Sequence, residues 1–124
     1  MKPKIAVVED NPDNRFLVQA LLEETYDLSE YETGAEVVAG MVQDAPDLVL
    51  LDISLPEMDG TEVLRWIRSQ ESLKEVPVVA LTAHAMAGDR EKFLAKGFND
   101  YITKPIVDDA ILLQVISRWL TSSE

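Results

Sequence analysis

The stretch from residue 48 to residue 60 reads LVLLDISLPEMDG and joins a run of large apolar residues to a turn. Two more short runs share this apolar, branched character, IAVV at 5–8 and VPVVAL at 76–81. All three are continuous, whereas a strand with one face in water alternates apolar and polar residues. They therefore predict strands that helices cover on both faces.

Amphipathic stretches separate these runs along the whole chain. Weaker strand patterns lie at 28–32 and 98–102 and bring the predicted strands to five. Helices are predicted over 13–25, 61–70 and 88–96, the last ended by Gly97, and over two segments with apolar residues at helical spacing: Val38, Met41, Val42 and Ala45, and Leu112, Val115, Ile116 and Trp119. This alternation predicts one α/β domain over residues 1–124, a doubly wound (βα)5, flavodoxin-like fold. The expected parallel sheet has the order 2-1-3-4-5, with helices on both faces.

Composition restricts the function before any motif is considered. The 124 residues contain no cysteine, which excludes disulfides, thiolate metal sites and cysteine nucleophiles. With 23 acidic and 11 basic residues the formal net charge is −12, which disfavours nucleic acid and anionic membranes and suits a cation or a basic partner. No signal peptide opens the chain and no apolar run is long enough to span a bilayer, so we expect a soluble cytoplasmic protein.

Acidic residues follow two of the predicted strands at the point where each ends. Glu9 and Asp10 come after the strand at 5–8, and Asp52 comes after the strand at 48–51. These strands are neighbours in the predicted sheet, so the three carboxylates converge at the edge where such folds bind ligands. Carboxylates this close repel one another, and a hard divalent cation such as Mg²⁺ compensates them. Loop or helix-cap roles are the alternative for each acid, but the grouping of three favours a cation site.

A hydroxyl and an ammonium group are predicted at the same edge. Thr82 follows the strand at 76–81, and Lys104 follows the last strand. Taken singly, Thr82 could equally be a helix N-cap and Lys104 a solvated surface lysine. Combined with carboxylates and a cation, they are the groups needed to place a phosphoryl group on an aspartate. The backbone carbonyl of Ser54 is close enough in sequence to Asp52 to face the same metal.

Four motifs make the sequence resemble the response regulator receiver domains, the CheY-like superfamily of two-component signalling. The motifs are Val8-Glu9-Asp10-Asn11, Leu50-Leu51-Asp52 with Pro56-Glu57-Met58-Asp59-Gly60, Leu81-Thr82-Ala83, and Lys104-Pro105. They occur in family order, with Thr82 30 residues and Lys104 52 residues after Asp52, and the match covers essentially the whole chain.

The resemblance implies a metal-dependent phosphoacceptor. Asp52 would accept the phosphoryl group. Asp10 and Asp52 would ligate Mg²⁺ directly, Glu9 would act through water, and Ser54 would contribute its backbone carbonyl. Mn²⁺ could replace Mg²⁺ in this set.

The resemblance also implies a conformational switch. Thr82 would be the hydroxyl that moves to the phosphoryl group, Lys104 would contact that group, and the Lys104–Pro105 peptide would be cis. Tyr101 matches an aromatic position whose ring changes between outward and inward orientations; packing of this ring on a neighbouring helix is compatible with that role. His84, the only histidine, and Ser54 occupy positions that tune the phosphoryl lifetime, although His84 could equally be an exposed loop residue without a role.

By the same resemblance, the protein is a signalling switch and not an enzyme acting on other substrates. A sensor histidine kinase or a histidine phosphotransfer protein would supply the phosphoryl group. An unknown downstream protein would bind the face formed by the predicted helix at 88–96, the strand at 98–102 and the last helix. Contacts to the donor would involve Asn14, Arg15, Val18 and Ile106, for which packing or surface roles are as plausible. Residues 82–89 resemble stand-alone receivers of bacterial cell-cycle type and receivers of hybrid kinases.

Further expectations concern size and rival functions. The chain ends soon after its last predicted helix, so we expect a single-domain regulator, a monomer with a dimer as the alternative. A phosphatase of haloacid-dehalogenase type would need a second aspartate where Ser54 stands. A receiver-like binding module without phosphorylation would lack Asp52, Asp10 or Lys104, and a nucleotide-binding module would carry a glycine-rich loop after the first strand.

Overall fold

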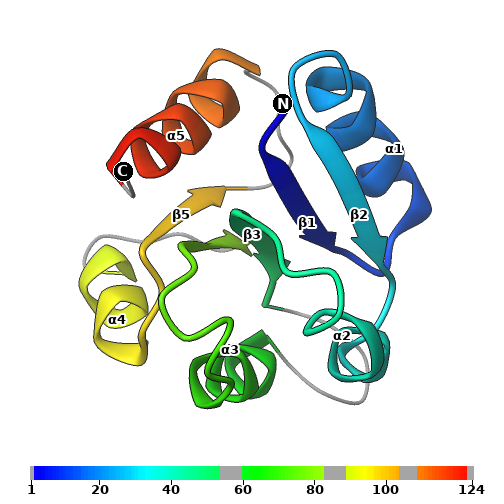
Figure 1. Ribbon diagram of the computed structural model, residues 1–124. Helices are drawn as coiled ribbons and strands as arrows, with labels where there is room; N and C mark the ends of the chain where they lie inside the picture. Colours follow the sequence, from blue (N-terminus) through cyan, green and yellow to red (C-terminus); the bar gives the residue numbers. More distant parts are fainter. Residues whose placement is uncertain (1, 54–59, 83–88, 104–108, 123–124) are drawn as a thin grey trace.

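Strands alternate with helices throughout the computed structural model, which describes residues 2–53, 60–82, 89–103 and 109–122 (Figure 1). The elements in chain order are β1 (Lys4–Val8), α1 (Pro12–Leu22), β2 (Asp27–Tyr31), α2 (Gly34–Gly40), β3 (Leu48–Asp52), α3 (Gly60–Ser69), β4 (Val78–Thr82), α4 (Asp89–Lys96), β5 (Asp100–Thr103) and α5 (Asp109–Ser122). All strand pairs are parallel, and the order is β2-β1-β3-β4-β5. The predicted fold class and strand order are confirmed.

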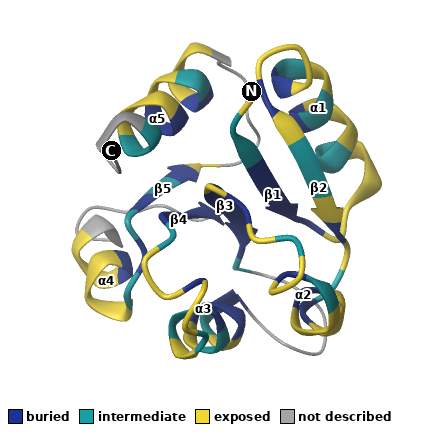
Figure 2. Cartoon of the chain, viewed as in Figure 1, coloured by how far each residue is buried: buried dark blue, intermediate teal, exposed yellow. Residues whose placement is uncertain are grey.

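The sheet is a central layer with helices on both faces. Helices α2, α3 and α4 lie on one face, and α1 and α5 lie on the other (Figure 1). Every residue of β3 and β4 is buried, whereas the edge strand β2 is partly exposed (Figure 2). The continuous apolar runs in the sequence thus reflect strands that are covered from both sides.

Two cores form because successive strand residues point to opposite faces of the sheet. In β3, Val49 and Leu51 pack toward α2, α3 and α4, while Leu48 and Leu50 pack toward α1 and α5. The predicted apolar set of the last helix is confirmed: Leu112, Val115 and Ile116 are buried in the second core, and Trp119 packs against it.

The predicted apolar face of the second helix is confirmed at Met41 and wrong at Val38, Val42 and Ala45. Helix α2 starts after Thr33, whose Oγ1 accepts a hydrogen bond from the Glu36 backbone N–H at 3.1 Å, and it ends at Gly40. Its buried side consists of Gly34, Val37 and the C-cap Met41. Val38 and Val42, which the sequence pattern placed on the buried face, are 41% and 40% exposed, because the helix begins and ends earlier than the pattern.

The other element boundaries agree with the predicted ones within a few residues. Helix α1 ends at Leu22 and not at residue 25, and β4 begins at Val78, after Pro77. Pro77 has no N–H for the sheet, but its carbonyl accepts from Val49 N at 2.9 Å. In the described part of the chain, no helix combines the length and the apolar character that a bilayer span requires.

Candidate functional site

Three carboxylates meet at the carboxyl edge of β1 and β3. Glu9, Asp10 and Asp52 each place an oxygen within 4.8 Å of the others. Glu9 and Asp52 are 1% and 2% exposed, and Asp10 is exposed to solvent. The predicted convergence of these acids is therefore observed, and it follows from the register that pairs Val8 with Leu51, each one residue before an acid. Such an oxygen-only donor set suits a hard cation such as Mg²⁺.

The start of helix α1 helps to fix Glu9. Asn11 caps the helix: its Oδ1 accepts from Asp13 N at 2.8 Å and from Asn14 N at 3.2 Å. The backbone N–H of Asn11 in turn donates to Glu9 Oε1 at 3.2 Å. Pro12, with its ring-fixed φ, follows as the first helical residue. The turn between β1 and α1 thus orients one carboxylate of the cluster.

Arg15 ties the backbone beneath this cluster to strand β2. Its Nη1 donates to the carbonyls of Glu9 at 2.9 Å and of Asp10 at 3.3 Å. Its Nη2 donates to Glu32 Oε1 at 2.8 Å, and its Nε lies 3.7 Å from Glu30 Oε1. The guanidinium therefore holds the main chain on which two of the carboxylates stand. In the sequence Arg15 is a candidate contact to the phosphoryl donor, with a packing or surface role as the alternative. Glu30 and Glu32, in and just after the predicted second strand, are the acidic residues that could have indicated this interaction.

Gly60 allows helix α3 to approach the end of β3 closely. A Cβ at this position would lie 2.5 Å from the Cα of Ile53 and 2.8 Å from the carbonyl oxygen of Asp52. The Gly60 N–H donates to Ile53 O at 3.1 Å. In the sequence Gly60 was interpreted as a turn glycine. In the structure it also removes the side chain that would displace the backbone of Asp52.

Thr82 and Tyr101 lie on the two strands beyond β3. Thr82 ends β4, is 2% exposed and pairs with Thr103 of β5, while Asp52 pairs with the preceding Leu81. The ring of Tyr101 packs on Phe93 of α4 with a centroid distance of 5.5 Å. The helix packing considered for this ring is thus observed. Thr82 stands at the same sheet edge as the three carboxylates.

The remaining candidate site and donor-contact residues either lie on helix α1 or fall outside the described residues. Val18 is 1% exposed and packs in the core between α1, α5 and the sheet, so the packing role is confirmed and the predicted contact with a donor is wrong. Asn14 is partly exposed on α1. Ser54, His84, Lys104, Pro105 and Ile106 lie outside the described residues.

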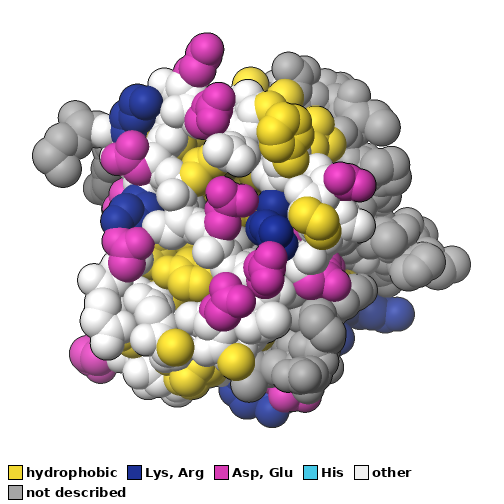
Figure 3. Space-filling model, turned by 90° about the vertical axis from the view of Figure 1, so that its right-hand side faces the viewer, with side chains coloured by type: hydrophobic (Ala, Val, Ile, Leu, Met, Phe, Trp, Pro, Cys, Tyr) yellow, Lys and Arg dark blue, Asp and Glu magenta, His cyan; other side chains and the backbone are white. Residues whose placement is uncertain are grey.

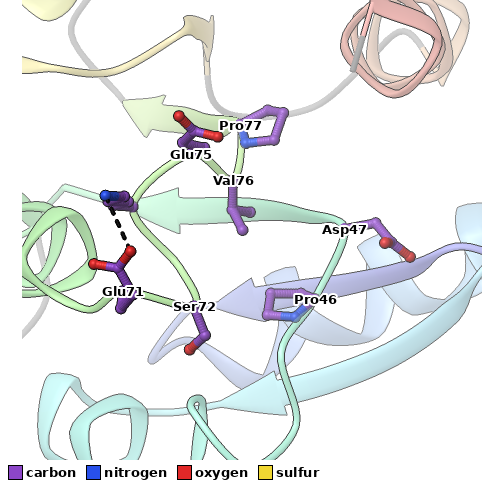
Figure 4. A pocket seen from close by; sticks show the side chains of 8 residues that line it. Pro46, Asp47, Glu71, Ser72, Glu75, Val76 and Pro77 are labelled. Carbon is purple, nitrogen blue, oxygen red and sulfur yellow. Dashed lines mark ion pairs between the residues drawn. The ribbon is translucent and has the colours of Figure 1, made fainter. Parts of the chain in front are cut away.

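A separate hollow lies at the opposite edge of the sheet. It has a volume of about 450 Å³ and lies where β3 and β4 begin (Figure 4). Its lining comes from two loops and consists of Pro46, Asp47, Glu71, Ser72, Lys74, Glu75, Val76 and Pro77. One of its acids is paired, because Lys74 Nζ lies 3.2 Å from Glu71 Oε1. The hollow shares no residue with the carboxylate site.

A family model, the response regulator receiver domain, matches residues 5–116. The chain belongs to this family. Receiver domains receive phosphoryl groups from histidine kinases and interact with downstream targets.

Relatives of two kinds share this receiver sequence. The sensor protein GacS of Pseudomonas syringae pv. syringae is 42% identical over 121 residues, which are 94% of this chain and 13% of GacS. The polar-differentiation response regulator DivK of Brucella ovis is 40% identical over 107 residues, which are 86% of this chain and 87% of DivK. The chain therefore spans nearly all of one kind of relative and a small part of the other.

A solved receiver structure is similar over the full length. The receiver domain of the sensor histidine kinase PA1611 from Pseudomonas aeruginosa PAO1 is 38% identical, with a TM-score of 0.87, and covers 98% of this chain and 99% of its own. That structure has a magnesium ion coordinated in its active site cleft.

Proposed function

We propose that this receiver domain accepts a phosphoryl group on Asp52 and thereby switches the binding of another protein. The observation that carries the proposal is the cluster of Glu9, Asp10 and Asp52 at the carboxyl edge of β1 and β3. Phosphoryl transfer needs charge compensation and positioning more than covalent chemistry by the protein. An aspartate beside two further acids, at the ligand-binding edge of the sheet, fits a metal-assisted acceptor.

The residues fit a divalent cation, and Mg²⁺ is the ion that we propose. Glu9, Asp10 and Asp52 would hold it, with the backbone carbonyl of Ser54 as a further ligand; Mn²⁺ would be a substitute. Two observations support the fit: the three donors are all oxygens within 4.8 Å, and Arg15 donates to backbone carbonyls of Glu9 and Asp10 and leaves their carboxylates to other partners. When bound, the ion would neutralise charge on the donor phosphoryl oxygens.

The transfer step forms one bond and breaks one. A carboxylate oxygen of Asp52 attacks the phosphorus of a phosphohistidine, the P–N bond breaks, and the imidazole leaves with the electron pair and takes a proton from solvent. The product, an aspartyl phosphate, carries a charge of about −2. We propose that Thr82 donates a hydrogen bond to it and that Lys104 offsets its charge. Ser54 and His84 would tune how long it survives.

The output of the switch would be a shift between two conformations. Thr82 lies on β4 beside β5, and Tyr101 of β5 packs on α4, so movement at Thr82 has a short path to the surface formed by α4, β5 and α5. Phosphorylation then has to change the free-energy difference between two states by only a few kcal/mol. The protein would act by binding a partner and not by turning over other substrates.

Partners and setting follow from the same proposal. The donor would be a sensor histidine kinase or a histidine phosphotransfer protein in the cytoplasm, and the receiver would act as a monomer or a dimer. The acidic surface over α1, β2 and α2 (Figure 3) fits neither nucleic acid nor an anionic membrane. Helix α1 exposes Phe16 by 72%, and this side chain offers apolar area to a protein donor.

One experiment tests the central claim. The protein is incubated with acetyl phosphate and Mg²⁺, and intact mass is measured for wild type, Asp52→Ala and the control Asp13→Ala, an exposed acid in the first turn of α1. We expect a gain of one phosphoryl group in wild type and in the control, and none in Asp52→Ala. A wild type that gains no acyl phosphate, or an Asp52→Ala variant that gains it equally, contradicts the proposal.

A further inference from the structure

Arg68 of α3 binds two further segments at the amino edge of the sheet, the edge opposite the carboxylate site. It lies in the last turn of α3, and its side chain is half-buried. Nη1 donates to the carbonyls of Lys74 at 3.0 Å and of Val76 at 2.7 Å. Nη2 donates to the carbonyl of Gly97 at 2.9 Å and to Asn99 Oδ1 at 2.8 Å. One guanidinium thus joins the loop before β4 to the junction between α4 and β5.

The acceptors of the half-buried Arg68 guanidinium carry no charge. All four are neutral oxygens, and no ion pair with an acid involves Arg68 within the described ranges. Burial lowers the pKa of Arg68, which remains charged. The charge stands at the end of α3 and beside the Gly97 carbonyl, just past the end of α4. Two helix C-termini, each the negative end of a dipole, therefore face the same cation.

The junction that Arg68 holds is also fixed to β4. Asn99 N donates to Val78 O at 2.8 Å, and Val78 N donates to Asn99 Oδ1 at 2.8 Å. Gly97 has a φ of +112°, a backbone conformation that favours glycine, and it ends α4. Residues 97–99 therefore have little freedom to move relative to the start of the sheet.

Helix α4 carries Phe93, whose ring contacts Tyr101. Phe93 lies one turn before Gly97; its ring packs on Tyr101 at 5.5 Å and, edge to face, on Phe98 at 5.9 Å. Phe98 N also donates to Phe93 O at 3.1 Å. A displacement of the end of α4 would therefore move the ring against which Tyr101 rests.

We propose that Arg68 is a positioning residue that holds the end of α4, so that α4 moves about its C-terminal end when Asp52 is phosphorylated. Arg68 acts through Gly97 and Asn99 on Phe93, and through Phe93 on Tyr101. It touches neither the acceptor nor the cation and sets how far a change at the carboxyl edge displaces α4. This inference rests on the proposed function.

The test compares Arg68→Lys with Arg65→Lys, an exposed arginine three residues earlier on the same helix. Lysine keeps the charge but lacks the planar fork that reaches four acceptors. NMR follows the Tyr101 ring signals and the amide exchange of residues 97–99, without and with acetyl phosphate and Mg²⁺. A second variant, Leu22→Ala in the core under α1, controls for lost stability.

In Arg68→Lys we expect faster amide exchange at residues 97–99 before any phosphorylation. We also expect a change in the equilibrium between the two orientations of the Tyr101 ring in the unphosphorylated protein. The orientation found after phosphorylation should become about fivefold more populated relative to the other, which is the lower end of typical coupling between sites. Arg65→Lys and Leu22→Ala should leave that equilibrium unchanged, and Asp52 should be labelled in all variants.

Two results would overturn the inference by itself. One is an Arg68→Lys variant whose Tyr101 signals without phosphoryl donor are the same as in wild type. The other is an equal shift in Leu22→Ala, which would make lost stability the cause. A wild type that is not labelled at Asp52 overturns the proposed function instead, and with it the link to the switch; the exchange data without donor still decide whether Arg68 anchors the junction.

Discussion

The rings of Phe93 and Tyr101 lie 5.5 Å apart between centroids, with their planes inclined at 43°. One ring belongs to α4 and the other to β5, so this contact joins a helix to the strand that pairs with Thr82. Since Phe93 is 7% exposed and Tyr101 is partly exposed, the contact lies where core and surface meet.

Replacing Phe93 should therefore affect both stability and the position of Tyr101. We expect Phe93→Ala to lower the free energy of unfolding by about 3–5 kcal/mol, the usual cost of deleting a buried phenyl ring. Phe93→Leu keeps apolar volume and should cost less, yet it should still change the Tyr101 ring signals. Urea unfolding and NMR measure the two effects. Tyr101 signals that are unchanged in Phe93→Leu would mean that the ring contact does not position Tyr101.

Removal of one carboxylate should separate metal binding from stability. Asp10 is exposed, and Asp10→Asn removes one of three like charges, whose pairwise repulsion is about 1 kcal/mol at 4 Å in water. In a chelator we expect Asp10→Asn to be as stable as wild type or slightly more stable. With Mg²⁺, wild type should gain thermal stability and Asp10→Asn much less. Asp13→Asn is the control, and equal Mg²⁺ stabilisation of Asp10→Asn would contradict the cation site.

Arg15 should influence metal affinity without touching the metal. Arg15→Lys keeps a positive charge but cannot reach both carbonyls and Glu32 at once. Loss of a supporting partner typically weakens metal binding by about 10–100-fold. We expect a loss near the lower end of this range, measured by titration with Mg²⁺. Arg65→Lys should bind as wild type does.

Gly60→Ala should disturb the site through the backbone. The added methyl group would meet the Cα of Ile53 at 2.5 Å and Asp52 O at 2.8 Å, so the end of β3 or the start of α3 must move. We expect a stability loss of about 1–3 kcal/mol, as for other overpacked positions, together with weaker Mg²⁺ binding. Gly40→Ala meets only Tyr31 Cε1 at 3.7 Å and is the matched control. Wild-type Mg²⁺ affinity in Gly60→Ala would show that the close approach does not position Asp52.

Acid should weaken the ion pair between Lys4, at the start of β1, and Asp44. Asp44 accepts hydrogen bonds from Lys4 and, at 2.7 Å, from Ser29 Oγ, and these bonds lower the pKa of Asp44 from 3.8. A lowered pKa contributes stability that is present above 3.8 and is lost as the pH falls through the folded value. In Asp44→Asn we therefore expect a smaller loss of stability between pH 4 and acid conditions, measured by urea unfolding. The control is Asp13→Asn; a slope equal to that of wild type in Asp44→Asn would contradict the assignment.

For Lys4, the basic partner of Asp44, the pKa shift and the pH dependence of stability have the opposite direction. Asp44 raises the pKa of Lys4 above 10.5, so the contribution of Lys4 is complete below 10.5 and is lost as the pH rises through the folded value. The ion pair between Lys4 and Asp44 should thus be intact around neutral pH. Ser29→Ala removes one acceptor interaction of Asp44 and should raise its pKa, which NMR titration of the carboxyl group measures.

The sequence was most informative where a physical rule links neighbouring residues. Continuous apolar runs predict strands covered on both faces, and the parallel order then brings Glu9, Asp10 and Asp52 to one edge. Both predictions are confirmed, because in a parallel sheet the strand order and register determine which residues lie at the same edge. The roles proposed for Ser54, His84, Tyr101, Thr82 and Lys104 remain predictions.

Features that depend on how helices leave the sheet were not predictable in this way. The Arg15 clamp requires the angle of α1 over β2, and the close approach of Gly60 requires the path of α3 past β3. Neither angle is encoded in a local pattern. The prediction for helix α2 was partly wrong for a related reason. The cap at Thr33 sets where the helix begins, whereas apolar spacing alone placed Val38 and Val42 on the buried face.

The bonds of Arg68 and the pair of Lys4 with Asp44 both lie at the amino edge of the sheet, whereas the three carboxylates lie at the carboxyl edge. The strands that separate these edges are five residues long in β1, β3 and β4. Substitutions at the amino edge that spare Arg68 and its acceptors can therefore raise thermal stability without altering the ligand-binding edge.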